Sequence, residues 1–223
     1  MGLIMMIKAV MFDLDGTLVN SLYDLANAVN FCLEAEGFKT HSVEQYKQFI
    51  GNGVYKLIER SLPQTHRTPE QINAVKDKYL QHYKQHCSDD TVCYDGIKEL
   101  VASLRAKGIK LAVITNKGQE TADMVVKKLF GNEFSFVIGQ NDETPLKPDP
   151  KSAKFVMEKL GFRSKECLFV GDSGVDMQTA LNAGAIPIGV LWGFREKQEL
   201  IENGAEYTVE YPARILEIIE ELR

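Results

Sequence analysis

The chain is poor in cysteine and has no long apolar run, and both shortages narrow the classes of protein to consider. Its cysteines, Cys32, Cys87, Cys93 and Cys167, form neither a C-x-x-C pair nor a zinc-ribbon spacing, so we expect reduced thiols and a cytoplasmic location. No segment has the length of a membrane-spanning helix. The apolar opening, residues 3–7, lacks the basic start and the cleavage site of a signal peptide, and we expect it to lead into the first strand.

An excess of positive charge is also lacking. The chain has 26 Lys and Arg residues against 31 Asp and Glu, a net charge of −5, which argues against nucleic acid or an anionic membrane as partner. The negative net charge does not exclude an anionic small molecule as substrate, because a few cations and a metal ion can make one pocket locally positive. The 223 residues, 44% of them hydrophobic, leave room for one α/β domain and a smaller one. We expect a monomer or a homodimer.

Short apolar segments that alternate with helical ones predict a parallel sheet. Helices are predicted between the strands, and a closing helix at residues 211–222. This pattern predicts an α/β fold, a Rossmann-like parallel sheet with helices on both faces, built from residues 1–17 and 91–223. The expected strands are residues 9–12, 109–114, 134–138, 167–170 and 186–191, with a short edge strand at 207–209.

Between these two parts of the core the chain has helical periodicity. Apolar residues recur at three- and four-residue steps from Leu22 to Leu33. Further helices are expected at residues 42–50, 54–62 and 69–85, the last with Thr68 as N-cap and Pro69 at its first position. No strand is predicted between residues 18 and 90. The pattern indicates a small inserted α-helical domain over residues 18–90.

Two carboxylates follow the first predicted strand directly. Residues two apart in a strand point to the same face, so we expect Asp13 and Asp15 to converge. Two unpaired carboxylates at the end of a buried strand are costly unless a metal, a shared proton or a substrate compensates them. Two solvated Asp residues in a polar turn before Gly16 are an equally good interpretation of this segment alone.

Other polar residues favour the functional interpretation, because they follow other predicted strands. Ligands of open α/β sheets bind beyond the carboxyl ends of the strands. Four segments bring carboxylates, a hydroxyl and a cation to that edge, which chance explains poorly. After the first strand come Asp13 and Asp15, after the second Thr115 and Asn116, after the third Lys147, and after the fourth Asp172 and Asp176.

These segments resemble the four motifs of the haloacid dehalogenase-like hydrolase superfamily, in order and spacing, from about residue 8 to residue 193. The helical insertion after the first motif is similar to that of the subgroup with an α-helical cap. Within that subgroup, Gly51-Asn52-Gly53 and Trp192-Gly193 resemble phosphoglycolate phosphatases. The motif residues are Asp13-Leu14-Asp15-Gly16-Thr17, Thr115-Asn116, Lys147-Pro148 and Gly171-Asp172-Ser173 with Asp176.

The resemblance implies a Mg²⁺-dependent phosphatase that acts on a small phosphate ester, with 2-phosphoglycolate as the first candidate. Asp13 would be the nucleophile that forms an aspartyl-phosphate, and Asp15 the general acid and base. Lys147 would supply positive charge. Thr115 and the backbone amides of Leu14 and Asn116 would bind the phosphoryl oxygens.

The resemblance also implies a metal site and a cap that sets specificity. Asp13, Asp172 and the backbone carbonyl of Asp15 would hold Mg²⁺, with Asp176 as a further ligand or as a brace. The cap residues Gly51, Asn52 and Gly53 would bind substrate, although a plain turn between helices explains the glycines about as well.

Other functions fit the same scaffold. A sugar phosphomutase similar to β-phosphoglucomutase would use the same Asp13 and Asp15, and a pyrophosphatase or nucleotidase is a further alternative. A non-catalytic phosphate-ligand sensor or partner-binding module is the alternative outside enzymes. The presence of Asp15 argues against a sensor, which has no need of a proton donor.

Overall fold

The computed structural model describes residues 6–223 and contains a six-stranded sheet in the order β5-β4-β1-β6-β7-β8. All neighbouring strands pair in parallel. The predicted fold class and the predicted edge strand are therefore confirmed, while residues 1–5 of the expected core lie outside the described residues. The strands are β1 (Ala9–Phe12), β4 (Lys110–Gly118), β5 (Phe136–Gln140), β6 (Cys167–Gly171), β7 (Ile186–Val190) and β8 (Tyr207–Val209).

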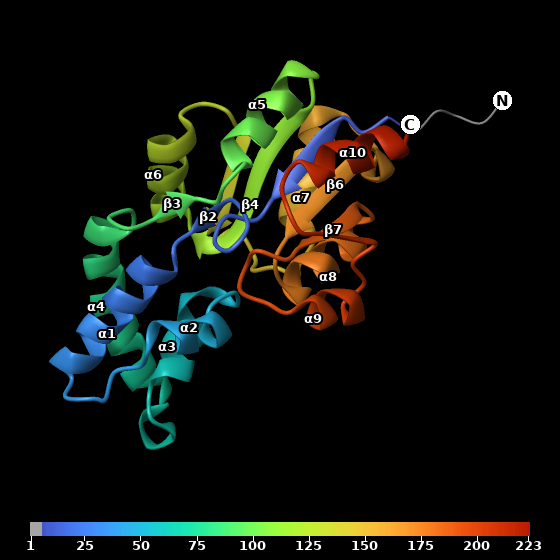
Figure 1. Cartoon of the computed structure of the whole chain (residues 1–223). Helices are drawn as coiled ribbons and strands as arrows, with labels where there is room; N and C mark the ends of the chain where they lie inside the picture. Colours follow the sequence, from blue (N-terminus) through green and yellow to red (C-terminus); the bar gives the residue numbers. More distant parts are fainter. Residues whose placement is uncertain (1–5) are drawn as a thin grey trace.

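Helices cover both faces of this sheet (Figure 1). Side chains alternate along β1, so Val10 and Phe12 join one hydrophobic cluster and Ala9 and Met11 the other. The first cluster includes α5, α6 and α10, and the second includes α7 and α8. These helices are α5 (Ile97–Ala106), α6 (Gln119–Phe130), α7 (Lys151–Leu160), α8 (Gly174–Ala183) and α10 (Arg214–Glu221).

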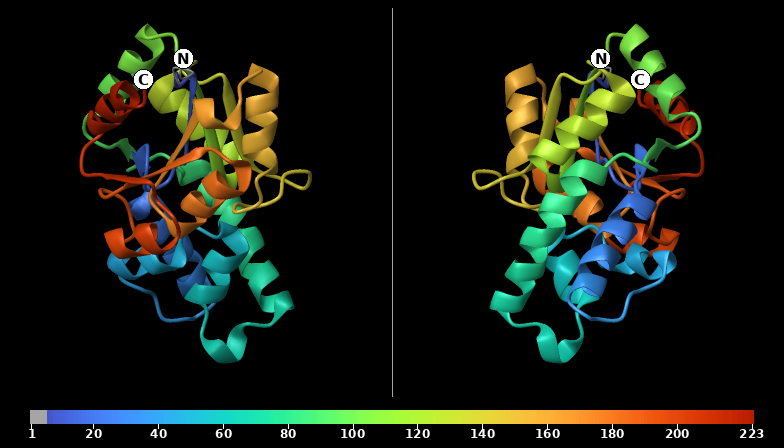
Figure 2. Two further views of the ribbon diagram at one scale, coloured as in Figure 1. Left: turned by 90° about the vertical axis from the view of Figure 1, so that its right-hand side faces the viewer. Right: turned by 90° about the vertical axis from the view of Figure 1, so that its left-hand side faces the viewer.

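A second group of helices lies apart from the sheet, at the lower left of Figure 1 and at the bottom of both views in Figure 2. The helices predicted for this insertion are confirmed. Thr68 caps α4 through a bond from the Gln71 amide, with Pro69 at the first position. The elements are α1 (Leu22–Ala35), α2 (Val43–Phe49), α3 (Gly53–Ser61), the short 3₁₀ helix η1 (Gln64–His66) and α4 (Pro69–His86).

The two chain segments that connect this group to the sheet pair with each other. Strand β2 (Val19–Asn20) runs antiparallel to β3 (Val92–Cys93). The prediction that residues 18–90 contain no strand was therefore wrong for Val19 and Asn20. Asp24 accepts hydrogen bonds from the Asp90 amide and from the amide and hydroxyl of Thr91. These bonds hold the two connecting segments next to each other. Strands of two residues have no periodicity that a sequence could reveal.

Three further differences from the predicted elements have local causes. Helix α10 begins at Arg214 and not at residue 211, because a residue before proline disfavours helical backbone and Pro212 follows Tyr211. Helix α9 (Lys197–Glu202) and the 3₁₀ helix η2 (Ser164–Glu166) were not predicted. Both are too short to show a clear helical period.

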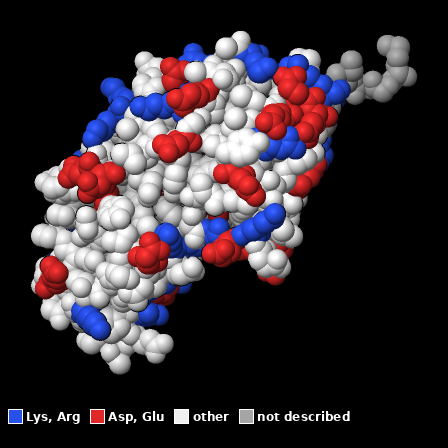
Figure 3. Space-filling model, in the orientation of Figure 1, with Lys and Arg blue, Asp and Glu red and all other residues white. Residues whose placement is uncertain are grey.

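The surface mixes charges of both signs. On the face in Figure 3, Lys and Arg side chains lie among Asp and Glu side chains. Within residues 6–223, none of the helices combines the length and the apolar character needed to cross a membrane.

Candidate active site

Three carboxylates from three segments meet beyond the carboxyl edge of the sheet. Asp13 follows β1, Asp172 follows β6, and Asp176 lies in the first turn of α8. One oxygen from each of them lies within 4.8 Å of the others, and all three residues are buried. We call Asp13, Asp172 and Asp176 the acidic group. The sequence predicted all three as metal ligands.

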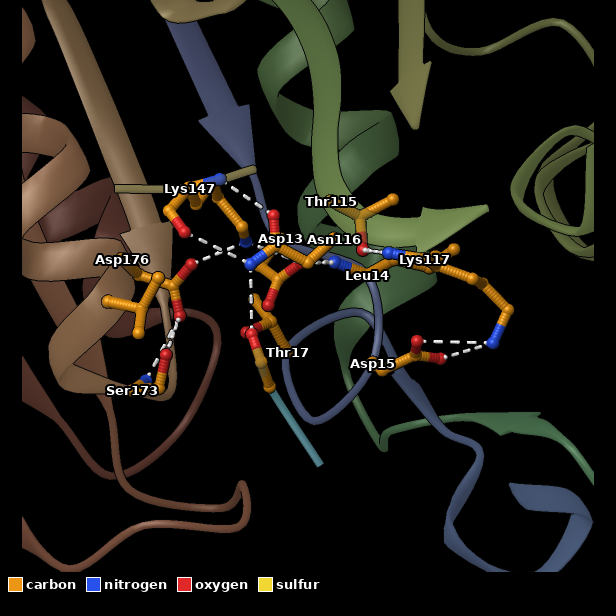
Figure 4. A network of polar contacts seen from close by, with 12 residues as sticks. Asp13, Leu14, Asp15, Thr17, Thr115, Asn116, Lys117, Lys147, Ser173 and Asp176 are labelled. Atoms are coloured by element: carbon orange, nitrogen blue, oxygen red, sulfur yellow. Dashed lines mark hydrogen bonds and ion pairs between the residues drawn. The ribbon is translucent and has the colours of Figure 1, made fainter. Parts of the chain in front are cut away.

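Lys147 is the cation in contact with the acidic group (Figure 4). Its Nζ lies 2.8 Å from Asp13 Oδ1 and 2.6 Å from Asp176 Oδ1. The Lys147 backbone is held by Asn116, whose Oδ1 accepts from the Lys147 amide at 2.7 Å. The acidic group thus has three carboxylates, of which Asp13 and Asp176 share one ammonium, and an excess of negative charge is left in a buried place.

Glycines allow the backbone to approach the acidic group closely. Gly16 has φ +85°, and a Cβ there would lie 2.4 Å from Asp172 Oδ2. A Cβ at Gly193 would lie 2.2 Å from the Asp172 Cβ. Any larger residue at either position would displace the Asp172 carboxylate.

Hydrogen bonds fix the orientation of each carboxylate. Asp172 accepts from the Phe194 amide at 2.7 Å and from Thr17 Oγ1 at 3.3 Å. Asp176 Oδ2 accepts from the amide and the hydroxyl of Ser173, at 3.1 and 2.6 Å. The acidic group is therefore held in place by the protein itself.

Burial disfavours the charged forms of these carboxyl groups. It raises the pKa of Asp13 to about 7, in spite of the opposing effect of Lys147. Burial and the charge of Asp176 raise the pKa of Asp172 to about 8. Although burial lowers the pKa of Lys147, Asp13 and Asp176 raise it above its usual value. The carboxylates need a further positive charge to be ionised together.

The residues present fit a small divalent cation. Carboxylate oxygens are the ligands that Mg²⁺ prefers, and the acidic group offers three from rigid positions. The excess negative charge around Lys147 has the sign and size that a divalent cation would balance.

The carboxylate of Asp15 is held by other groups than the acidic group. Lys117 Nζ lies 2.9 Å from its Oδ1 and 3.1 Å from its Oδ2, and Ser21 Oγ donates to its Oδ1 at 2.6 Å. Lys117 also donates to Tyr83 Oη of α4 at 2.5 Å. Asp13 and Asp15 therefore lie on the same cavity but contact different lysines (Figure 4).

The predicted residues at the end of β4 lie between these two lysines. Thr115 Oγ1 accepts from the Lys117 amide at 3.2 Å. The Asn116 side chain donates to the carbonyl of Gly51 at 3.0 Å and to that of Lys147 at 3.3 Å. We expected only the backbone amide of Asn116 to act, but its side chain also ties the sheet edge to the turn before α3.

A cavity of about 330 Å³ lies between the sheet edge and helices α3 and α4. Leu14, Asn52, Lys147 and Asp176 are not among the residues of its wall. The amide of Leu14 donates to Asp13 Oδ1 at 2.7 Å, and the side chain of Asn52 accepts from Arg60 at 2.8 Å. The predicted site residues on the wall are Asp13, Asp15, Gly51, Gly53, Thr115, Asn116 and Asp172.

The sequence of the chain matches the model of one protein family, the haloacid dehalogenase-like hydrolases, over residues 10–190. The chain belongs to this family. The acidic group, Lys147, Asp15 and Thr115 all lie on segments within the matched range.

Individual relatives of this hydrolase agree with the family. A phosphoglycolate phosphatase of Pasteurella multocida is 34% identical over 221 residues, 96% of this chain and 98% of that protein. One of Pseudomonas syringae pv. tomato is 33% identical over 214 residues, 94% of this chain and 78% of that protein. A crystal structure from Lactobacillus delbrueckii subsp. bulgaricus superposes with a TM-score of 0.91 at 32% identity and covers 96% of this chain and 99% of its own.

Three cations on the cavity wall of this hydrolase, Lys76, Lys117 and Arg195, were not predicted. Lys117 directly follows the motif residues Thr115 and Asn116 near the end of β4, and this position was a signal that could have been used. Arg195 follows Trp192-Gly193, beyond β7. Its Nη2 donates to the Ile50 carbonyl at 2.7 Å, its Nη1 to the Lys47 carbonyl, and its Nε lies 3.4 Å from Glu199 Oε2.

Proposed function

We propose that this hydrolase is a Mg²⁺-dependent phosphatase that cleaves a small phosphate monoester through an aspartyl-phosphate on Asp13, with 2-phosphoglycolate as the first candidate. One observation carries the proposal. Asp13 contacts Lys147 and lies close to the other two carboxylates of the acidic group, while Asp15 faces the same cavity. A nucleophile, a site for positive charge and a proton donor thus share one cavity.

In the first step, an oxygen of Asp13 attacks phosphorus and the bond from phosphorus to the ester oxygen breaks. Asp15 donates a proton to the departing oxygen, so that the leaving group is released as an alcohol. Lys147, which contacts Asp13 Oδ1, lowers the repulsion between the carboxylate and the phosphoryl group. Thr115, at the end of β4, donates its hydroxyl to a phosphoryl oxygen.

In the second step, water attacks the phosphorus of the aspartyl-phosphate. Asp15 takes a proton from this water, and the bond to Asp13 breaks to release inorganic phosphate. The bonds from Ser21 and Lys117 hold the Asp15 carboxylate in one position through both steps. The sum of the two steps is ester plus water to alcohol plus phosphate.

Asp13, Asp172 and Asp176 would hold the Mg²⁺ ion, as the fit of the acidic group supports. Bound there, Mg²⁺ would neutralise negative charge on the phosphoryl oxygens. The backbone carbonyl of Asp15 stays a predicted further ligand. The expected cytoplasmic location and the monomer or homodimer state also stay predictions.

Residues 18–90 would form a cap domain that closes the cavity and excludes water. The contacts of Asn116 with Gly51 and of Arg195 with Ile50 support this role, since both join the helical group to the sheet edge. The small cavity favours a small ester, and the names of the relatives favour 2-phosphoglycolate.

The test is phosphate release with Mg²⁺ over a panel of small phosphate esters, for the wild type and for Asp13→Asn. We expect release to concentrate on 2-phosphoglycolate and to fall by at least about 10⁴-fold in Asp13→Asn, as for the loss of other enzyme nucleophiles. Activity that survives in Asp13→Asn would contradict the aspartyl-phosphate. Weak phosphate release from many esters that is lost in Asp13→Asn would contradict 2-phosphoglycolate as the substrate and leave the mechanism in place. Isomerisation of a sugar monophosphate in the presence of its bisphosphate would indicate a mutase.

A further inference from the structure

Lys117 is a buried cation on the wall of the cavity, and only one carboxylate faces it. Its side chain is 3% exposed, yet it lines the cavity beside Asp15. Its Nζ contacts Asp15 and Tyr83 Oη, and it lies 4.7 Å from the centre of the Tyr83 ring. Its three N–H donors reach both oxygens of Asp15 and Tyr83 Oη. When Asp15 carries the proton that it donates in the proposed function, one of its oxygens no longer accepts, and one donor of Lys117 is left for a ligand.

Tyr83 offers a second donor at the same place. Its hydroxyl oxygen accepts from Lys117, which leaves its own proton free to donate. Tyr83 is 2% exposed and also lines the cavity. While Asp15 is protonated, Lys117 and Tyr83 together form a two-donor site with positive charge, and such a site suits a carboxylate.

The position of this pair relative to Asp15 points to the leaving group of the ester. In the proposed function, Asp15 must come within about 3 Å of the ester oxygen, the length of a hydrogen bond. Lys117 Nζ lies 2.9 Å from Asp15 Oδ1, so it lies within about 6 Å of that oxygen. A carboxylate on the carbon bonded to the ester oxygen can bridge this distance with one further hydrogen bond.

The other cations of the cavity wall are engaged elsewhere. Arg195 donates to the backbone carbonyls of Lys47 and Ile50 and pairs with Glu199. Lys76 is half-buried and donates to Asn73 Oδ1 at 3.0 Å. Behind the wall, Lys147 contacts Asp13 and Asp176 on the phosphoryl side. Within the described chain, Lys117 is therefore the cation placed beside the leaving group.

We propose that Lys117, assisted by Tyr83, binds a carboxylate on the carbon next to the scissile ester oxygen. This makes Lys117 a specificity-determining residue, which selects phosphate esters of α-hydroxy acids over esters of the same size whose alcohol is uncharged. The inference rests on the proposed function, because the site of the leaving group follows from the role of Asp15.

The test compares two esters of similar size in the wild type and in Lys117→Met. They are 2-phosphoglycolate and 2-hydroxyethyl phosphate, which we call the neutral ester because its leaving group is uncharged. We expect kcat/KM for 2-phosphoglycolate to fall about 100-fold more than kcat/KM for the neutral ester, the scale of a hydrogen bond to a charged group. Lys117→Arg keeps the charge and should restore part of the preference. Tyr83→Phe should reduce the preference less, since it leaves the ammonium in place.

The matched control is Arg195→Gln, which removes the other large cation of the wall. It should lower kcat/KM for both esters by the same factor. Equal losses on both esters in Lys117→Met would overturn the inference, because Lys117 would then act only through Asp15 or through folding. A wild type without preference between the two esters would overturn it as well.

A binding experiment separates this inference from the proposed function. Calorimetry with glycolate, the alcohol expected from 2-phosphoglycolate, is carried out on the wild type and on Lys117→Met. Glycolate that binds the wild type and not Lys117→Met supports the carboxylate site, even if the wild type hydrolyses no ester and the proposed function fails. Glycolate that binds both equally, or neither, overturns the site.

Discussion

The two halves of the cavity are each organised around a buried lysine, and they differ in charge balance. The side chains of Lys147 and Lys117 are 4% and 3% exposed. Lys147 contacts Asp13 and Asp176, which form the acidic group with Asp172, so this half holds three carboxylates and one ammonium. Lys117 faces the single carboxylate of Asp15. In the proposed function the half around Lys147 would bind the phosphoryl group, and we call it the phosphoryl half; the half around Lys117 would bind the leaving group, and we call it the leaving-group half. The phosphoryl half lacks positive charge, and the leaving-group half is balanced while Asp15 is ionised.

This difference shows how similar ion pairs serve different purposes. A buried ion pair adds little net stability, since desolvation offsets the attraction between the charges. Excess negative charge around Lys147 makes a place for a cation. The pair at Lys117 is balanced while Asp15 is ionised, and it makes a place for an anion when Asp15 carries the proton that it donates in the proposed function. The halves also differ in which elements contribute to them. Tyr83 of α4, in the inserted helices, contacts Lys117, while the ion-pair partners of Lys147 in residues 6–223 come from the end of β1 and the start of α8.

The largest effect is expected from Lys147→Met, which removes the ammonium of the phosphoryl half. Asp13 and Asp176 would lose their shared partner, and breaking a buried pair costs about 3–5 kcal/mol of unfolding free energy. Denaturant unfolding without Mg²⁺ measures this loss. Unchanged stability would mean that the carboxylates are not ionised together in the metal-free protein.

Asp172→Asn tests whether the excess negative charge of the acidic group binds Mg²⁺. Mg²⁺ at 100 times its Kd should stabilise the wild type by about 2.7 kcal/mol, through its preference for the folded state. We expect Asp172→Asn to lose most of this stabilisation in thermal unfolding with and without Mg²⁺. The matched control is Asp15→Asn, which should keep it, because the Asp15 side chain faces Lys117. Equal Mg²⁺ effects in both variants would contradict the division into halves.

Arg195→Gln tests the closure of the cavity. Arg195 donates to the carbonyls of Lys47 and Ile50 at the end of α2, where a helix leaves its last carbonyls without a partner inside the helix. The loss of about 1–2 kcal/mol from such charge-assisted bonds should lower kcat/KM roughly 10-fold for any ester. Hydrogen exchange of the amides of α2 should increase in parallel. Faster exchange without a change in kcat/KM would show that closure does not limit the reaction.

The smallest effect is expected from Ser21→Ala, in the leaving-group half. Ser21 donates to Asp15 Oδ1 at 2.6 Å, but Lys117 holds the same carboxylate. A net hydrogen bond of about 1 kcal/mol corresponds to a roughly 5-fold fall in kcat, with KM little changed. Steady-state kinetics on 2-phosphoglycolate measure it. A fall as large as that of Lys117→Met would show that Ser21, and not Lys117, positions Asp15.

The sequence by itself determined the sheet, its flanking helices and the edge at which the polar residues gather. Apolar runs that alternate with helical periods are local signals, and the carboxyl ends of parallel strands necessarily meet at one edge. These signals suffice to place Asp13, Thr115, Lys147 and Asp172 together. The helices from Leu22 to His86 were also predictable, because their apolar periodicity and the N-cap at Thr68 can be recognised in short stretches of the sequence.

Tertiary structure decided which partner each charge has. Asp13 and Asp15 are two residues apart and chemically identical, yet one contacts Lys147 and the other Lys117. Arg195 reaches a carbonyl 145 residues earlier in the chain, and the β2–β3 pair joins segments too short to have a period. Such contacts depend on distances between segments that are far apart in sequence, and a local pattern of residues contains no information about those distances.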